Sequence, residues 1–309
     1  MTRTIDDLPL NPGRYELKLP VGRGRGRQVL PVWWQRGESL RPVLAVTSMV
    51  HGDEYEGFGA VLRFRDTLKR RRIQGSVLIL PVCNPAAAGA ATRCTPDTLD
   101  GRNLARCFPG SARGTGTQQL ARRIWDLVQT ADLVVDLHSG GAGYDYLPLA
   151  GFYRARDRDF AACLPIRTLW KIPPGPGVLG YELTRRGRRA VGTEYSGEAR
   201  CNPKGVGAYA VGLLRIMHKL KMVPSPPRGA LPRERPIIKR TVYQCVDSNG
   251  WFLARVKVDD RVRRGDALGE WVGEDLQRST LKSRLSGRVL AIRTLPRMSR
   301  GDYVSLMGS

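Results

Sequence analysis

The feature that most constrains the fold of this chain is a series of short, continuous apolar segments separated by helical patterns. The apolar segments are Val43–Thr47, Val77–Val82, Leu133–Leu137 and Ala190–Glu194, and the helical patterns are Glu54–Arg72, Gln118–Gln129 and Val206–Leu220. Short apolar runs between helices are typical of strands buried on both faces of a parallel sheet. We therefore predict an α/β fold with a mixed, mostly parallel sheet flanked by helices.

Two further strands are expected ahead of this series, at Tyr15–Val21 and Gln28–Trp34. The sequence GRGRGR joins them at residues 22–27. No helical pattern follows this turn, so it is not a dinucleotide-binding fingerprint.

The C-terminal part of the chain has a different pattern. Prolines cluster between residues 224 and 236, which indicates a linker, and the sequence beyond them is typical of β structure. Two segments there resemble each other, Gly250–Trp271 and Gly287–Met307, and this predicts a small quasi-symmetric barrel-sandwich module. We expect an α/β domain at residues 1–223, a Pro-rich linker at 224–239 and a C-terminal β module at 240–309.

Three polar side chains follow the ends of predicted strands. His51 and Glu54 form an H-x-x-E motif after the first buried strand, and His138 follows a later one. In parallel sheets the carboxyl ends of the strands meet at one edge, where ligands bind. Two imidazoles and one carboxylate suit a catalytic zinc, because they leave one coordination position open. Asp136 shares a strand face with His138, and we expect it to orient that ligand through a hydrogen bond.

With these motifs, the chain resembles the succinylglutamate desuccinylase/aspartoacylase family, which is related to the zinc carboxypeptidases. The resemblance runs from about Val43 to Leu220 and implies that His51, Glu54 and His138 bind one zinc ion per chain. It also implies that Glu194, in the sequence GTEYSG, is the general base. Independently, a carboxylate at a third strand end suits proton transfer from water to a leaving nitrogen.

The sequence RCTPDTLDGRNLARCFPG resembles the arginine-containing substrate loop of that family. By this match Arg93 polarises the scissile carbonyl and Arg106 binds a substrate carboxylate. The chain departs from the family at Ala105, where an asparagine usually precedes the arginine. Asn103 is not its equivalent, since it lies two residues earlier, but it joins Arg106 as a candidate substrate-binding residue.

The composition gives broader expectations. The net charge is +23, with basic residues spread along the chain, and this favours an anionic small-molecule substrate. The sequence shows no nucleic-acid-binding motif, so we expect no dedicated nucleic-acid site. The sequence also lacks an apolar run long enough to cross a membrane and an apolar N-terminal leader, which predicts a cytoplasmic protein. A homodimer is the default assembly.

These observations predict a zinc-dependent amidohydrolase that cleaves a small N-acyl amino acid or a related N-acyl amine. Two alternatives stay open. The first is a carboxypeptidase acting on short peptides. The second is a catalytically inert zinc-binding protein of the same fold, which only the substitution at Ala105 favours.

Overall fold

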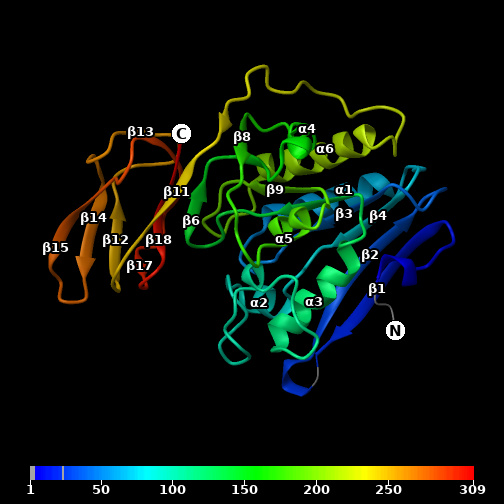
Figure 1. Ribbon diagram of the computed structural model, residues 1–309, viewed down its shortest axis with the longest axis horizontal. Coiled ribbons are helices and arrows are strands. Elements are labelled where there is room, and N and C mark those ends of the chain that lie inside the picture. Colours follow the sequence, from blue (N-terminus) through cyan, green and yellow to red (C-terminus); the bar gives the residue numbers. More distant parts are fainter. Residues whose placement is uncertain (1–3, 23) are drawn as a thin grey trace.

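The computed structural model describes residues 4–22 and 24–309, so part of the GRGRGR turn, at Arg23, lies outside the described residues. Its main feature is a nine-stranded sheet with the order β1-β2-β4-β3-β5-β9-β7-β8-β10 (Figure 1). The strands are β1 (Gly13–Val21), β2 (Gln28–Arg36), β3 (Val43–Thr47), β4 (Ser76–Leu80), β5 (Leu133–Leu137), β7 (Leu149–Phe152), β8 (Thr168–Lys171), β9 (Ala190–Glu194) and β10 (Ile237–Ile238).

The central strands run parallel, from β4 through β3 and β5 to β9. Strands β1 and β2 form an antiparallel hairpin at one edge, and β7 is antiparallel to β9. Thr47 pairs with Asp136, and Leu137 pairs with Thr193, so β3, β5 and β9 end at the same edge. This confirms the predicted mixed, mostly parallel sheet.

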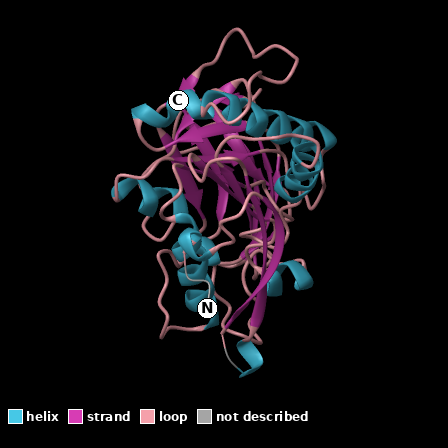
Figure 2. Cartoon of the chain, turned by 90° about the vertical axis from the view of Figure 1, so that its right-hand side faces the viewer, coloured by secondary structure: helices cyan, strands magenta, loops and turns pink. Residues whose placement is uncertain are grey.

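Helices cover both faces of this sheet (Figure 2). The longer ones are α1 (Glu56–Leu68), α3 (Gly116–Val128) and α6 (Pro203–Lys219), and the shorter ones are α2 (Pro85–Ala90), α4 (Arg158–Ala161) and α5 (Leu179–Arg185). Alternate residues of each strand enter two different cores. Leu44 and Val46 pack with α1 and α6, whereas Val43 and Ala45 pack with α3 and α5. Burial on both faces explains why these strands read as continuous apolar runs.

The C-terminal part forms two antiparallel sheets. Their orders are β11-β18-β16-β13 and β15-β14-β12-β17. The strands are β11 (Thr241–Cys245), β12 (Gly250–Ala254), β13 (Arg261–Val262), β14 (Ala267–Gly273), β15 (Arg278–Lys282), β16 (Gly287–Arg293), β17 (Arg297–Met298) and β18 (Tyr303–Gly308). Each repeat folds as a long strand, a two-residue strand and a long strand. The short strand of each pairs with the first long strand of the other, which confirms the predicted quasi-symmetry.

Two pairings connect this module to the large sheet. Strand β6 (Tyr144–Tyr146) adds to the module through β16, and β10 adds to the large sheet beside β8. Strand β10 lies inside the Pro-rich segment, so that segment contributes an edge strand to the large sheet. The division into a zinc hydrolase domain at residues 1–223, a Pro-rich linker at 224–239 and a β module at 240–309 stays a prediction.

The prediction for the first helix was wrong at both ends. It begins at Glu56 and ends at Leu68, so Glu54 precedes it. The turn ahead of the helix depends on a close backbone approach, because a Cβ atom at Gly52 would lie 2.0 Å from the carbonyl carbon of Ala87. This packing holds residues 48–55 as a turn instead of a first helical turn. Among the described residues, no helix is both long and apolar enough to cross a membrane.

Candidate metal centre and active site

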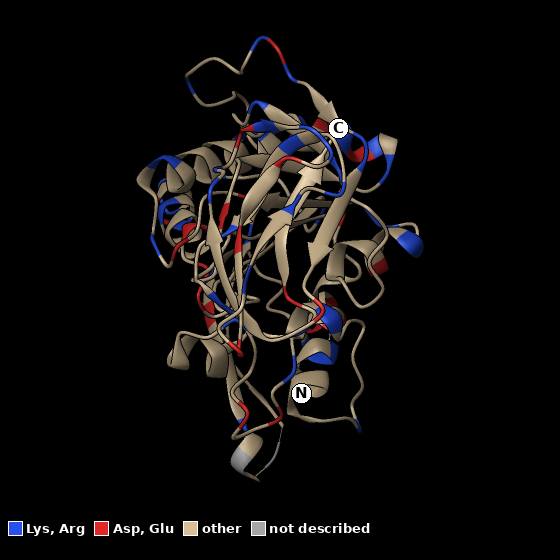
Figure 3. Ribbon diagram, turned by 90° about the vertical axis from the view of Figure 1, so that its left-hand side faces the viewer, with Lys and Arg blue, Asp and Glu red and all other residues tan. Residues whose placement is uncertain are grey.

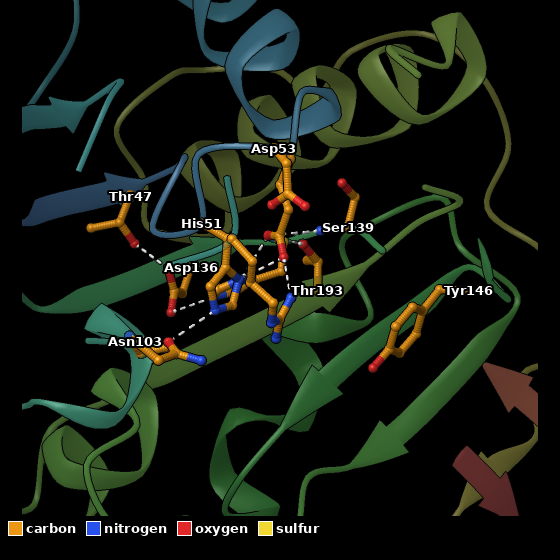
Figure 4. A network of polar contacts seen from close by, with 12 residues as sticks. Thr47, His51, Asp53, Asn103, Asp136, Ser139, Tyr146 and Thr193 are labelled. Carbon is orange, nitrogen blue, oxygen red and sulfur yellow. Dashed lines mark hydrogen bonds and ion pairs between the residues drawn. The ribbon is translucent and has the colours of Figure 1, made fainter. Parts of the chain in front are cut away.

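Three side chains converge beyond the ends of β3 and β5. One ligand atom each of His51, Glu54 and His138 lies within 4.8 Å of the others. The Nδ1 atom of His51 is 2.6 Å from Oε1 of Glu54, and Nδ1 of His138 is 2.9 Å from Oε2 of the same carboxylate. The backbone N–H of Ser139 also donates to Glu54, which holds the carboxylate between the two rings. Figure 4 shows this network in close-up.

The second nitrogen of each imidazole ring, Nε2, also has a polar partner. Nε2 of His51 is 3.2 Å from the amide oxygen of Asn103, and Nε2 of His138 is 3.1 Å from Oδ2 of Asp136 (Figure 4). The hydroxyl of Thr47 donates to the other oxygen of Asp136 at 2.6 Å. When Nε2–H donates outward, Nδ1 is left with a free lone pair, and this is the arrangement of histidines that bind metal ions. The donor set therefore fits one metal ion, bound through the two Nδ1 atoms and the glutamate.

Burial and neighbouring charges together set the charge state of these groups. Burial and the nearby Arg93 lower the pKa of His51 to about 4, so this ring is neutral at physiological pH. Burial alone would raise the pKa of Glu54, but its two imidazole contacts hold that pKa below its usual range. Burial would lower the pKa of His138, whereas Asp136 and Glu54 raise it well above the usual value. The two carboxylates that contact His138 therefore favour its protonated form.

A cavity of about 190 Å³ opens beside the two histidines. Arg93, Arg106 and Glu194 line it together with Asp136. The volume is below the roughly 300–1,000 Å³ of sites for drug-sized ligands, which favours a small substrate.

Glu194 ends β9 at the same edge of the sheet as His138. Its Oε2 atom is buried and has no hydrogen-bond partner among the described residues. Burial and the charge of Glu54 raise the pKa of Glu194 well above its usual range. This carboxyl group is therefore available to exchange a proton with a ligand in the cavity.

The two arginines differ in how they are held. Arg93 is partly buried, and its guanidinium donates to Oε1 of Glu54 at 3.2 Å. Arg106 is exposed, and its guanidinium donates to the carbonyl of Ala105 at 3.1 Å. No carboxylate among the described residues forms an ion pair with Arg106, so its guanidinium can accept an anionic ligand.

Asn103 contacts a candidate metal ligand and does not line the cavity. Its side-chain oxygen accepts from the backbone N–H of Ala105 and contacts His51, and it is not among the residues that line the cavity. The geometry favours a role in orienting the ring of His51 over contact with a substrate.

Sequence reasoning missed the aromatic side chains of the cavity. Tyr146, Tyr153 and Trp170 come from the sheet region, and Tyr243 and Tyr303 come from the C-terminal module. The hydroxyls of Tyr146 and Tyr303 are 2.8 Å apart, and the rings of Tyr243 and Tyr303 meet edge to face. Thus the module supplies part of the cavity wall. The aromatic residues carry no motif signal, since their convergence depends on pairing between β6 and β16.

The chain is similar to known proteins of one family. The catalytic domain of the succinylglutamate desuccinylase/aspartoacylase family matches residues 41–218. A solved member from Rhodobacter sphaeroides superposes with a TM-score of 0.83 at 27% identity, covering 98% of each chain. An aspartoacylase family protein from Mesorhizobium loti gives 0.75 at 26% identity, covering 96% of this chain and 95% of that one. The matched domain thus places the chain in a family of hydrolases, and the site adds a candidate metal centre. The chain belongs to the succinylglutamate desuccinylase/aspartoacylase family.

The names of two relatives specify a substrate or a pathway. N-alpha-acetyl-L-2,4-diaminobutyric acid deacetylase of Halomonas elongata is 32% identical over 184 residues, which are 56% of this chain and 53% of that protein. The matched region thus spans about half the length of that relative. The product-bound structure of the ectoine utilization protein EutE (DoeB) from Ruegeria pomeroyi has a TM-score of 0.83 at 24% identity, with 97% of each chain covered, and shows the shared fold.

Proposed function

We propose that this protein is a zinc-dependent deacylase that hydrolyses the amide bond of a small N-acyl amino acid. One observation carries the proposal: three ligand atoms that fit one metal ion converge beside a cavity that also contains Glu194 and two arginines. A deacetylase among the matched relatives supports an acetyl group as the first acyl group to test.

Zinc held by His51, Glu54 and His138 would supply Lewis acidity, which makes water nucleophilic near neutral pH and polarises a carbonyl group. Side chains of the protein would carry out the proton transfer and bind the substrate. Glu194 takes a proton from the attacking water and delivers it to the leaving nitrogen. Its buried, unpartnered Oε2 supports this role, because no internal hydrogen bond competes for the proton.

Arg93 faces the oxyanion that develops on the carbonyl oxygen, and Arg106 binds the carboxylate of the substrate. Asn103, expected at first to bind substrate, is better placed to orient His51 through Nε2, as Asp136 orients His138. Such contacts behind the ligands fix the direction of the lone pair that binds the metal.

The test is release of free amine from N-acetyl-L-amino acids by metal-loaded protein. We expect turnover that a chelator abolishes and added zinc restores. Short peptides with free N-termini are the control substrates, and the small cavity predicts slow cleavage of them. Cleavage of peptides alone would support the carboxypeptidase alternative, and bound zinc without any turnover would support the inert one.

The remaining expectations stay predictions. The chain is strongly basic, and Figure 3 shows Lys and Arg spread over several elements with Asp and Glu between them. These expectations are assembly as a homodimer, a cytoplasmic location and the lack of a dedicated nucleic-acid site.

A further inference from the structure

The cavity has two chemically different sides. The polar side includes the candidate metal ligands His51 and His138, with Glu194 and Arg93. The other side is an apolar wall, which consists of Tyr153, Trp170, Ile172, Pro173, Pro174 and Val178. Four of these residues lie between the end of β8 and the start of α5, whereas Trp170 belongs to β8 and Tyr153 follows β7.

Glycines on the sheet make room for the apolar wall. A Cβ atom at Gly151 would lie 2.5 Å from Cδ1 of Ile172, and one at Gly192 would lie 3.0 Å from the same atom. The ring of Tyr153 fills the space beside Gly180 in the same way. The side chain of Ile172 therefore lies directly on β7 and β9, and the ring of Tyr153 packs on α5.

The apolar wall adjoins Arg106. The backbone N–H of Phe108 donates to the carbonyl of Gly177 at 3.0 Å, and a Cβ at Gly177 would lie 2.4 Å from the carbonyl oxygen of Arg106. Arg106 and the apolar wall also line the same cavity, so the rest of an amino acid whose carboxylate binds Arg106 is within reach of the wall.

Carboxylates are scarce around this cavity. Among the described lining residues, only Asp136 and Glu194 carry one. Asp136 already contacts His138 and Thr47, and Glu194 is the proposed base. Arg93 and Arg106 add positive charge to the same space. An ammonium group on the substrate side chain would therefore lose water without gaining an anionic partner.

We propose that the amino acid released by this protein has an uncharged, apolar side chain, which lies against the apolar wall while Arg106 binds the α-carboxylate. This inference rests on the proposed function. The inferred substrate differs from that of the deacetylase of Halomonas elongata, whose named substrate has an aminoethyl side chain.

The test uses two substrates of nearly equal size and opposite polarity. N-acetyl-L-norvaline has a methyl group where Nα-acetyl-L-2,4-diaminobutyrate has an ammonium group. We expect metal-loaded wild-type protein to prefer the norvaline compound in kcat/KM by about tenfold or more. Calorimetry on the Glu194→Gln variant should show the same preference in Kd, since it measures binding without turnover.

A pair of variants tests the position of the side chain. Ile172→Glu adds a carboxylate to the apolar wall, and Ile172→Gln adds a group of the same length without charge. The Glu variant should shift the ratio of the two kcat/KM values, and of the two Kd values, toward the diaminobutyrate compound by about tenfold relative to the Gln variant.

The outcomes separate the two proposals. Hydrolysis of both compounds at equal rates, or faster hydrolysis of the diaminobutyrate compound, would overturn the apolar specificity and leave the deacylase function intact. Preferential binding of the norvaline compound without hydrolysis by wild type would support the specificity and contradict the deacylase function. Binding of neither compound would overturn both.

Discussion

The two sides of the cavity differ in how firmly the protein holds their polar groups. On the metal side, the side chains of His51, Glu54 and His138 are 3%, 2% and 13% exposed, and each has more than one polar contact. On the substrate side, Arg106 is exposed, and among the described residues its guanidinium donates only to the neighbouring carbonyl of Ala105. The protein itself thus holds the polar groups of the metal side in place, whereas the charge of Arg106 is free to bind a ligand.

The largest effect is expected where the two sides meet, at Glu194. Glu194→Gln keeps the shape of the side chain and removes its ability to accept a proton. We predict that kcat falls by about 100- to 10,000-fold while the metal content is unchanged. Steady-state kinetics and elemental analysis of the same preparation check both statements. Near-normal turnover would remove Glu194 from the mechanism.

Arg106→Ala tests the substrate side alone. Because charge-assisted bonds to a carboxylate are strong, we predict a drop in kcat/KM of about 10- to 100-fold for an N-acyl amino acid. The matched control is Arg102→Ala, an exposed arginine of the same loop that does not line the cavity.

A carboxamide analogue of the substrate completes this experiment. Wild-type protein should discriminate strongly between carboxylate and carboxamide, and Arg106→Ala should not. If wild-type protein hydrolyses both equally, Arg106 does not bind the anion and the natural substrate is neutral at this position.

Asn103→Ala tests how the metal side is organised. Loss of the oxygen that faces Nε2 of His51 should weaken metal binding by about tenfold, as is common for groups that orient a ligand. Asn103→Asp, which keeps an acceptor at the same place, should retain the affinity. Competition with a chelator measures both. If Asn103→Ala instead raises only KM, the residue acts on the substrate.

The smallest effect is expected from Ala105→Asn, which introduces the amide usual in the family. A neutral hydrogen bond contributes about 0.5–1.5 kcal/mol, so KM for a carboxylate substrate should fall several-fold. Ala105 is buried and lines the cavity, so thermal unfolding should accompany the kinetics to exclude damage to packing. An unchanged KM with unchanged stability would mean that Ala105 does not adjoin the substrate carboxylate.

The same comparison explains what could be predicted from the sequence. The strands before His51 and His138 are buried on both faces, so they appear as uninterrupted apolar runs, and their parallel pairing places both histidines at one edge. The turn that contains Glu54 was less predictable. Its conformation depends on the approach of Gly52 to Ala87, which lies 35 residues further along the chain.

The substrate side could not be predicted in this way. Tyr153 and Ile172 adjoin strands of only four residues, too short to show a periodic pattern. Tyr303 reaches the cavity because β6 pairs with β16, and these strands are far apart in the sequence. The metal side follows from local patterns, and the substrate side follows from contacts between distant segments.

The most direct test of the account is the metal content of the histidine variants. Elemental analysis should find about one divalent metal ion per chain in wild-type protein, as expected for a catalytic site with three protein ligands. His51→Ala and His138→Ala should lose the ion. His218→Ala should keep it, because this third histidine contacts the carbonyl of Val223, away from the cavity. Full metal occupancy in both His51→Ala and His138→Ala would contradict the assignment of the metal centre.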